Sequence, residues 1–412
     1  MMTDTSNEEM MREDGERPRG SLDGLRILDL SRILAGPTAT QLLADLGAEV
    51  IKVEKPGSGD DTRSWGPPFV PDASGGDSDL SAYFLCANRN KKSIAIDLAS
   101  EDGVALLRRL VAISDVVVEN YKPGDLARRG IGYDDLVRIK PDIIWCAITG
   151  FGQTGPYSDR IGYDFLIQAM GGIMSITGDP DSAGGRPLKV GVGIADVMCG
   201  MYATVGILAA LRHRDRTGQG QYIDLALYDS QLAWLVNAAT NHLVSGRVPT
   251  RIGNAHPNIA PYQTFPASDE HLAIAVGNDQ QFARFAEAVG RAEWAADPRF
   301  RRNRDRLVHI DALRTLIEAE ICKDTALAWE QRLLKVGVPA GRVATIQSVL
   351  ADPHTLARGM VVEMAGEDPD TPLRLLGNPL NLSATPIQYR SPPPHLDADR
   401  DAVMHLLDQE AE

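Results

Sequence analysis

Short apolar segments alternate with amphipathic segments between residues 24 and 150, and this pattern constrains the fold more than any other feature of the chain. The apolar segments are β-branched and bounded by turn residues, which predicts buried strands. Helices are predicted between them, at 38–47 and 101–113. Repeated alternation of this kind is typical of an α/β protein with a doubly wound, Rossmann-like parallel sheet. The predicted strands lie at 25–30, 48–56, 92–98, 114–120 and 141–150.

The pattern changes after residue 150, where glycine becomes dense up to about residue 200. A long apolar helix and a further strand follow, and then mixed segments that predict a second, smaller α+β domain. Four divisions result: a disordered tail at 1–20, a large α/β domain at 21–230, a small domain at 240–335, and a return segment at 336–412 whose terminal helix packs on the large domain.

Charge and composition exclude several classes of partner. The formal net charge is −14, so the surface would repel a polyanion, and general binding of nucleic acid is not expected. The N-terminal segment has no apolar core typical of a signal peptide, and no apolar run was expected to approach the roughly 20 residues that span a bilayer. Four scattered cysteines without a CxxC pair predict reduced core thiols. We therefore expect a soluble, cytoplasmic protein without a membrane partner.

The common enzyme motifs are missing. The sequence contains no GxxxxGK[ST] phosphate loop, no HExxH and no GxSxG. Gly191 and Gly193 begin a dinucleotide-like pattern, but Asp196 stands where the third glycine belongs. The Rossmann-like pattern therefore does not imply NAD, and the fold alone leaves the function open.

Asp196 and Asp164 are the candidate catalytic carboxylates. Asp196 lies between a glycine-rich segment and a long apolar helix, and Asp164 opens another apolar helix. Backbone N–H groups and the helix dipole can hold a carboxylate at such a position. The alternative for each is an ordinary helix N-cap, the usual role of Asp at a helix start.

Basic residues cluster near the predicted strand ends, where ligands collect in open α/β sheets. They could hold phosphates, although a solvated turn explains the same pattern. His256 lies between turn residues and is more typical of a structural or solvated side chain. The basic residues are Lys52, Lys55, Arg89, Lys91, Lys92, Arg128 and Arg129.

Several long blocks follow one another from Leu22 to about Pro386. They include LDGLRILDLSRILAGPTATQLLADLGAEVIKVEKPGSGDDTR, FLCANRNKKSIAIDL, DVVVENYKPGDLARRGIGYDDL, ITGFGQTGPYSDRIGYD, DVMCGMYATVGILAALRHRDRTGQGQ and RIGNAHPNIAPYQTF. In this order the blocks resemble the family III CoA-transferases. This family includes formyl-CoA transferase, carnitine CoA-transferase and succinyl-CoA:glutarate CoA-transferase, with α-methylacyl-CoA racemase as a relative.

The resemblance implies a function for these residues. Asp196 would be the covalent nucleophile, with Asp164 and Tyr163 beside it. Coenzyme A would be a co-substrate and no metal would be required. The family forms interlocked homodimers, and its active site lies between a large and a small domain. The implied CoA contacts are Ile33, Leu34, Ala35, Lys55, Asn90, Lys91, Asn120, Tyr121 and Arg128.

Two departures from the family patterns narrow the activity. Tyr163 stands where the racemases carry His, which removes the base that racemisation uses. The glycine-run lid of formyl-CoA transferase is also missing, and Gly253, Asn254 and His256 occupy the comparable loop. Exchange of CoA between acids larger than formate and oxalate is therefore expected. The resemblance to the succinyl-CoA-dependent branch of the family favours transfer from succinyl-CoA to a small dicarboxylic acid. The alternatives are an acyl-CoA racemase and a non-catalytic CoA-binding protein of the same fold.

Overall fold

A six-stranded parallel sheet forms the centre of the first of two compact units in the computed structural model, which describes residues 20–72, 74–366 and 371–410. The predicted tail at 1–20 falls almost entirely outside these residues. The strand order is β5-β2-β1-β6-β7-β8. Its strands are β1 (Arg26–Asp29), β2 (Glu49–Glu54), β5 (Lys91–Ala95), β6 (Val116–Glu119), β7 (Ile144–Thr149) and β8 (Gln221–Ala226).

The chain winds outwards from β1 in both directions, so the sheet is doubly wound as predicted. β1 pairs with β2 on one side and with β6 on the other, all in parallel register. The connections after β1 and β6 therefore leave the sheet side by side, at the point where the strand order reverses. Ligands of open α/β sheets bind at this kind of edge.

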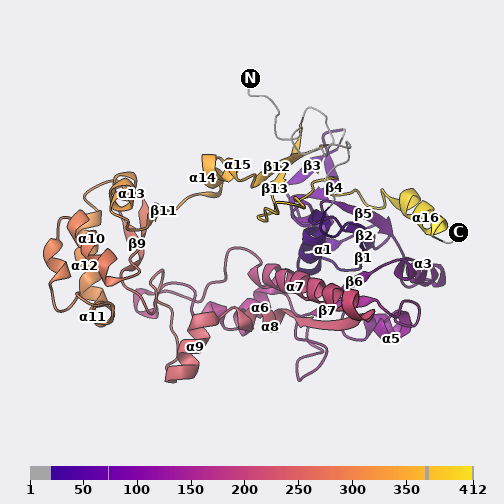
Figure 1. The fold of residues 1–412 in the computed structure, drawn as a ribbon, viewed down its shortest axis with the longest axis horizontal. Coiled ribbons are helices and arrows are strands. Elements are labelled where there is room, and N and C mark those ends of the chain that lie inside the picture. Colours follow the sequence, from indigo (N-terminus) through magenta and orange to yellow (C-terminus); the bar gives the residue numbers. More distant parts are fainter. Residues whose placement is uncertain (1–19, 73, 367–370, 411–412) are drawn as a thin grey trace. The chain divides into compact units, whose positions relative to one another are not determined.

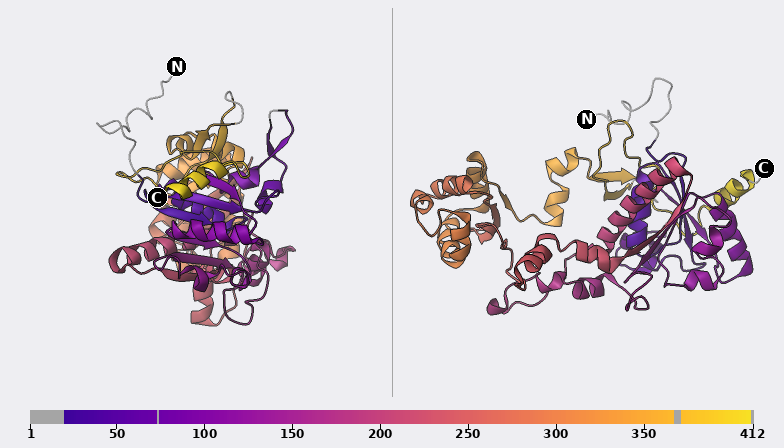
Figure 2. Two further views of the ribbon diagram at one scale, coloured as in Figure 1. Left: turned by 90° about the vertical axis from the view of Figure 1, so that its right-hand side faces the viewer. Right: turned by 60° about the horizontal axis from the view of Figure 1, so that its bottom comes forward.

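Each face of the sheet carries its own hydrophobic core, because the strands are buried on both sides. Helices cover both faces (Figures 1 and 2). One face packs against α1 (Ala35–Asp45) and α7 (Ile194–Thr217). The opposite face packs against α3 (Glu101–Ala112), α4 (Asp125–Arg128), α5 (Tyr133–Leu136) and α16 (Arg400–Gln409).

Helix α7 has 24 residues and a mean hydropathy of 1.8 in its most apolar stretch, so length and composition alone would let it cross a membrane. The expectation that no such stretch exists was wrong. Half of the stretch is buried inside the protein, and the helix packs along α1 and β7. The core helix of a globular domain has the same composition, because it is apolar around most of its circumference.

Smaller elements complete the first unit. They are η1 (Asp61–Ser64), β3 (Phe69–Pro71), β4 (Asp77–Ser81), α2 (Ala82–Leu85), α6 (Asp164–Met170), α8 (Leu227–Ala233), α15 (Pro353–Ala357), β12 (Val361–Met364) and β13 (Leu373–Leu376). Cys146 and Cys199 are buried and Cys86 and Cys322 are exposed, so the prediction of core thiols holds for only two of the four.

The second unit comprises residues 173–189 and 237–352. It has its own core around an antiparallel sheet of order β11-β10-β9. The sequence-based division assigned 173–189 to the large domain and ended the small domain at 335. The elements are η2 (Ile173–Ser175), η3 (Asp181–Ala183), α9 (Val236–Ser245), β9 (Tyr262–Pro266), β10 (His271–Ala275), α10 (Asp279–Ala288), η4 (Ala292–Ala295), α11 (Asn303–Val308), α12 (Ile310–Ile321), α13 (Ala326–Lys335), β11 (Ala340–Arg342) and α14 (Ile346–Leu350).

Candidate active site

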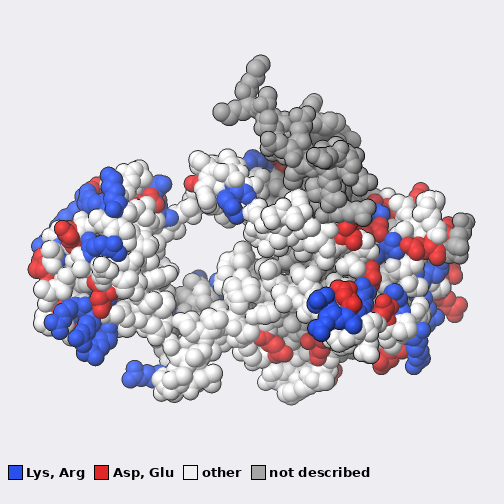
Figure 3. All heavy atoms as spheres, viewed as in Figure 1, with Lys and Arg blue, Asp and Glu red and all other residues white. Residues whose placement is uncertain are grey.

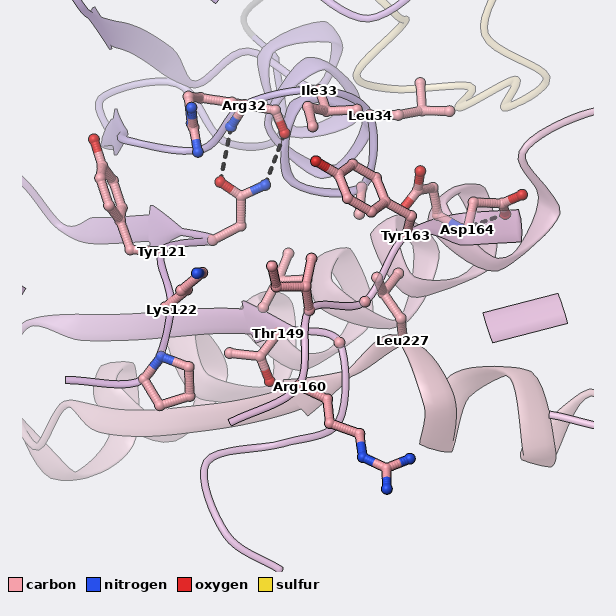
Figure 4. Close-up of a pocket in the computed structure, with 18 of the residues that line it drawn as sticks. Arg32, Ile33, Leu34, Tyr121, Lys122, Thr149, Arg160, Tyr163, Asp164 and Leu227 are labelled. Carbon is pink, nitrogen blue, oxygen red and sulfur yellow. Dashed lines mark hydrogen bonds between the residues drawn. The ribbon is translucent and has the colours of Figure 1, made fainter. Parts of the chain in front are cut away.

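A cavity of about 400 Å³ opens where the connections after β1 and β6 leave the sheet (Figure 4). Its walls come from the β1–α1 connection, the segment after β6, the glycine-rich loop after β7 and the first turns of α6 and α7. Eight of the residues predicted from the sequence meet here, although they are up to 163 positions apart. They are Ile33, Leu34, Ala35, Asn120, Tyr121, Tyr163, Asp164 and Asp196.

The β1–α1 connection is held by side chains from two other segments of the chain. Asn120 accepts a hydrogen bond from the Arg32 amide at 3.0 Å and donates one to the Arg32 carbonyl at 2.8 Å (Figure 4). The Ile33 amide donates to the Asp60 carboxylate at 3.2 Å. Ile33 has φ +75°, a left-handed conformation that is rare for a β-branched residue. Strained backbone of this kind clusters at functional sites, and here it lines the cavity.

Asp196 lies in the first turn of α7 and is 9% exposed. Burial, and to a smaller extent the nearby charge of Asp164, raise its pKa to about 7. No cation forms an ion pair with Asp196 within the part of the chain that the structure describes. A poorly solvated carboxylate without a counter-ion is a stronger nucleophile than one in water.

Asp164 supplies the cap of α7 from a different helix. The N-cap residue of α7 is Gly193 and that of α6 is Tyr163, so neither acid is the N-cap of its own helix. The Asp164 carboxylate accepts the Ala195 amide at 2.8 Å and the Asp196 amide at 3.4 Å. Gln168 donates to its other oxygen at 2.7 Å. The first amides of α7 are therefore occupied by Asp164, and they do not hold the Asp196 side chain as the sequence suggested.

Two tyrosines lie near the acidic pair. The Tyr163 side chain is 54% exposed and extends towards the Ile33–Leu34 backbone (Figure 4). Tyr83, on α2, was missed by sequence reasoning. Burial raises its pKa to about 12, and the negative charges of Asp196, Cys86 and Asp164 contribute. No local motif marks Tyr83, because α2 is brought to the acids only by the tertiary fold.

A second hollow of about 370 Å³ adjoins the first and shares Arg32, Tyr121 and Asp125 with it. Lys55, a predicted CoA contact, lines this hollow. Arg129 lines it too, whereas the predicted Arg128 does not. The Arg128 side chain is 68% exposed and pairs with Asp125. The structure thus favours Arg129 over its neighbour as a cation for a ligand that extends from one hollow to the other.

Asn90 and Lys91 face the protein interior, which corrects their prediction as CoA contacts. The Lys91 ammonium is fully buried and donates to Asp29 at 3.0 Å, to Asn88 at 2.9 Å and to the Pro37 carbonyl at 3.1 Å. Asn90 donates to Asp45 at 2.9 Å and to the Gln388 carbonyl at 2.7 Å. An ammonium group has three donors, and all three of Lys91 are used inside the fold. Neither side chain is placed to reach a phosphate.

A sequence model described as CoA-transferase family III matches residues 22–400, so the chain belongs to this family. The succinate–glutarate CoA-transferase of Agrobacterium fabrum is 46% identical over 392 residues, which cover 94% of this chain and 96% of that protein. The succinyl-CoA:glutarate CoA-transferase of Mus musculus is 45% identical over 343 residues, 83% of this chain and 76% of its own. The crystal structure of a CAIB/BAIF family protein from Brucella suis has a TM-score of 0.84 at 47% identity, covering 95% of this chain and 100% of that one.

Proposed function

We propose that the protein transfers CoA from succinyl-CoA to a small dicarboxylic acid such as glutarate, through covalent intermediates on Asp196. The family and the names of its relatives support the reaction and its substrates. The observation that carries the mechanism is the buried Asp196 carboxyl at the cavity wall, whose pKa of about 7 reflects its poor solvation. A thioester carbonyl that enters the cavity would meet this carboxylate.

The first half of the reaction moves CoA onto the enzyme. The Asp196 carboxylate attacks the donor thioester, the carbon–sulfur bond breaks, and CoA leaves as a thiolate. The product is a mixed anhydride between Asp196 and the donor acyl group. The thiolate then attacks the aspartyl carbonyl, which forms an aspartyl-CoA thioester and releases the donor as a free carboxylate.

The second half reverses these steps with the acceptor. The acceptor carboxylate attacks the aspartyl-CoA thioester and expels the thiolate, and a second mixed anhydride forms. The thiolate attacks the acceptor's acyl carbonyl, so the new acyl-CoA leaves and the Asp196 carboxylate is regenerated. No net proton transfer is needed, because carboxylates and thiolates exchange places throughout.

The neighbouring residues have distinct roles in this scheme. Asp164 fixes the first turn of α7, and therefore the position of Asp196. Lys55 and Arg129, in the adjoining hollow, would pair with phosphates of CoA, while its thiol end reaches the cavity. Tyr163 carries a phenol, which is a poorer general base than the imidazole that the racemases carry at this position. It can orient a bound acid by hydrogen bonding, which favours transfer over racemisation.

Assembly as an interlocked homodimer is part of the proposal. An apolar, exposed surface follows α6 and the first half of α7, and large surfaces of this kind mark association sites. The last turns of α7 are charged, whereas its first half shows almost no charge on the face drawn (Figure 3). The exposed residues of this apolar surface include Phe165, Leu166, Met201, Tyr202 and Val205.

A panel of acyl-CoA donors and free carboxylic acids, assayed by mass spectrometry, tests the proposal. We expect succinyl-CoA with a dicarboxylate acceptor to give the highest rate. Hydroxylamine added to enzyme and donor should derivatise Asp196, and the adduct should be absent without donor. Incubation of a 2-methylacyl-CoA in deuterated water is the second arm. Deuterium at the α-carbon without CoA transfer from any donor would make the protein a racemase.

A further inference from the structure

The segment Asn120–Pro123 forms one wall of the active-site cavity, yet it belongs to no helix or strand. Two side chains hold it. Asn120 binds the Arg32 backbone, as described above, and Glu119 accepts the Tyr121 amide at 2.7 Å. Because Glu119 is the last residue of β6, its carboxylate anchors the segment to the central sheet.

Glu119 is buried, with 6% of its surface exposed. The indole of Trp145, on β7, lies close enough to the carboxyl to stabilise its ionised form. Among the described residues no cation forms an ion pair with it, and burial raises its pKa to about 7. Its stabilising neighbours are thus neutral groups. Burying a carboxylate without a counter-ion costs free energy, and carboxylates in this situation are common at functional sites.

A separate cavity of about 370 Å³ lies behind the same segment. Lys122 and Pro123 line this rear cavity as well as the active-site cavity. Glu119, Trp145 and Tyr222 line only the rear one. The segment is therefore a wall between two hollows, and it has room to relax backwards if its anchor to the sheet is lost.

We propose that Glu119 is a positioning residue for the acyl-CoA site, because its bond to the Tyr121 amide holds the Asn120–Pro123 segment against the cavity that contains Asp196. Glu119 acts through this segment and does not touch the substrate. The inference rests on the proposed function for its substrate, but its effect is on CoA binding and can be measured without turnover.

The charge of Glu119 should affect this bond, since an ionised carboxylate accepts an amide more strongly than a neutral carboxyl. The titratable groups around it are Tyr121 on the segment, Asp125 on α4, Cys146 on β7, Tyr222 on β8, and Lys122, Tyr133, Asp134 and Asp135 on the rear cavity. Burial is the larger cause of the raised pKa of Glu119, and the charge of Asp125 is a smaller one. The affinity for CoA should therefore decrease as the pH falls through about 7.

The test is Glu119→Gln, which keeps the size and the acceptor oxygen but cannot ionise. We expect the Kd for CoA, measured by calorimetry at pH 8, to rise about tenfold, and the KM for acyl-CoA to rise with it. The kcat should change less than about twofold. The dependence of CoA affinity on pH between 6 and 8 should flatten. Trp145 fluorescence should titrate near pH 7 in the wild type and not in the variant, with Trp145→Phe identifying the signal.

Asp134→Asn is the matched control, because Asp134 is exposed on the same rear cavity and has no bond to the segment. It should leave the Kd unchanged. If Glu119→Gln does not fold, Trp145→Phe removes the indole that stabilises ionised Glu119 and should raise the Kd about threefold. An unchanged Kd in the folded variant, or equal losses in kcat and in thermal stability without a change in Kd, would overturn the proposal. A wild type that binds CoA but transfers it to no acid would contradict the proposed function and leave this inference standing.

Discussion

The adjacent strands β2, β1 and β6 each end in an acid at the same edge of the sheet, but only two of these acids are paired with a cation among the residues that the structure describes. Glu54 pairs with Arg63 at 2.7 Å, and Asp29 pairs with Lys91 at 3.0 Å. Glu119, at the end of β6, accepts the Tyr121 amide and lies near the indole of Trp145, and both of these groups are neutral. Burial opposes ionisation of all three, but nearby cations lower the pKa of Glu54 and Asp29, the latter to about 2, whereas that of Glu119 rises to about 7.

The difference separates structural from functional carboxylates. Glu54 and Asp29 stay ionised because cations pair with them, and these ion pairs stabilise the strand ends as part of a rigid scaffold. Asp196 belongs with Glu119, since burial raises its pKa to a similar value. These two are the carboxyl groups, among the described residues, whose pKa is raised. One lies in the active-site cavity and the other anchors its wall, so the uncompensated charge is concentrated at the site.

The largest expected effect comes from Asp196→Asn, which keeps the shape but cannot form an anhydride. CoA transfer should fall by at least about a thousandfold. Because the folded pKa is raised above the unfolded value, the stability linked to the neutral acid is present below pH 4 and is lost as the pH rises through about 7. Asn removes this loss, so the variant should be more stable than the wild type at pH 8, by on the order of a few kcal/mol.

Chemical denaturation at pH 4 and pH 8, together with a transfer assay, measures both effects. The two proteins should converge in stability towards pH 4. Substantial turnover by the folded variant would refute the covalent mechanism. Equal stability at pH 8 would mean that Asp196 is solvated and belongs with the ordinary surface acids.

Lys91→Met tests the acids that are paired with cations. Removing one partner of a buried pair leaves Asp29 short of a cation, and this should lower the free energy of unfolding by about 3 kcal/mol. Lys92→Met is the control, because Lys92 is 39% exposed and pairs with Glu49 at the surface. It should cost less than about 1 kcal/mol. Loss of CoA affinity in Lys91→Met at unchanged stability would restore Lys91 as a phosphate contact.

These two lysines also show what the sequence could predict. The strands with β-branched runs were located correctly, because a short run of apolar residues can be recognised in the local sequence. Adjacent residues in a strand point to opposite faces, and nothing in the cluster NRNKK shows which lysine is turned inwards. Asp164 opens α6, as the sequence predicted. Its role in capping α7 depends on packing across 31 residues, between its carboxylate and the Ala195 amide, and no local pattern shows this contact.

Replacing Lys55 or Arg129 with Ala should weaken CoA binding about tenfold, because a charge-assisted contact contributes about 1.5–3 kcal/mol. Arg128→Ala should weaken it less than twofold, since that side chain projects into solvent. Calorimetry at low and moderate salt measures all three variants. A larger loss in Arg128→Ala than in Arg129→Ala would show that CoA does not enter the hollow lined by Lys55.

Asp164→Asn should shift the pH dependence of kcat/KM. The rate requires ionised Asp196, so it should decrease below an apparent pKa of about 7 in the wild type. Asn keeps a hydrogen-bond acceptor for the α7 amides but removes a negative charge, so the pKa of Asp196 falls and the acid limb moves to lower pH. A limb that does not move would show that burial alone sets the pKa of Asp196.

The smallest expected effect is that of Ile33→Asn, at the strained position beside the cavity. Asn tolerates the left-handed conformation far better than a β-branched residue, so the free energy of unfolding should rise by about 0.5–1 kcal/mol. The hydrogen bond from the backbone amide of residue 33 to Asp60 does not involve the side chain, so the loop should keep its conformation. The apolar side chain is lost from the cavity wall, however, so the KM for acyl-CoA should rise about two- to threefold. Parallel denaturation and kinetic measurements separate the two effects. If Asn lowers stability and leaves KM unchanged, the Ile33 side chain serves packing, and the strain at this position has no part in shaping the site.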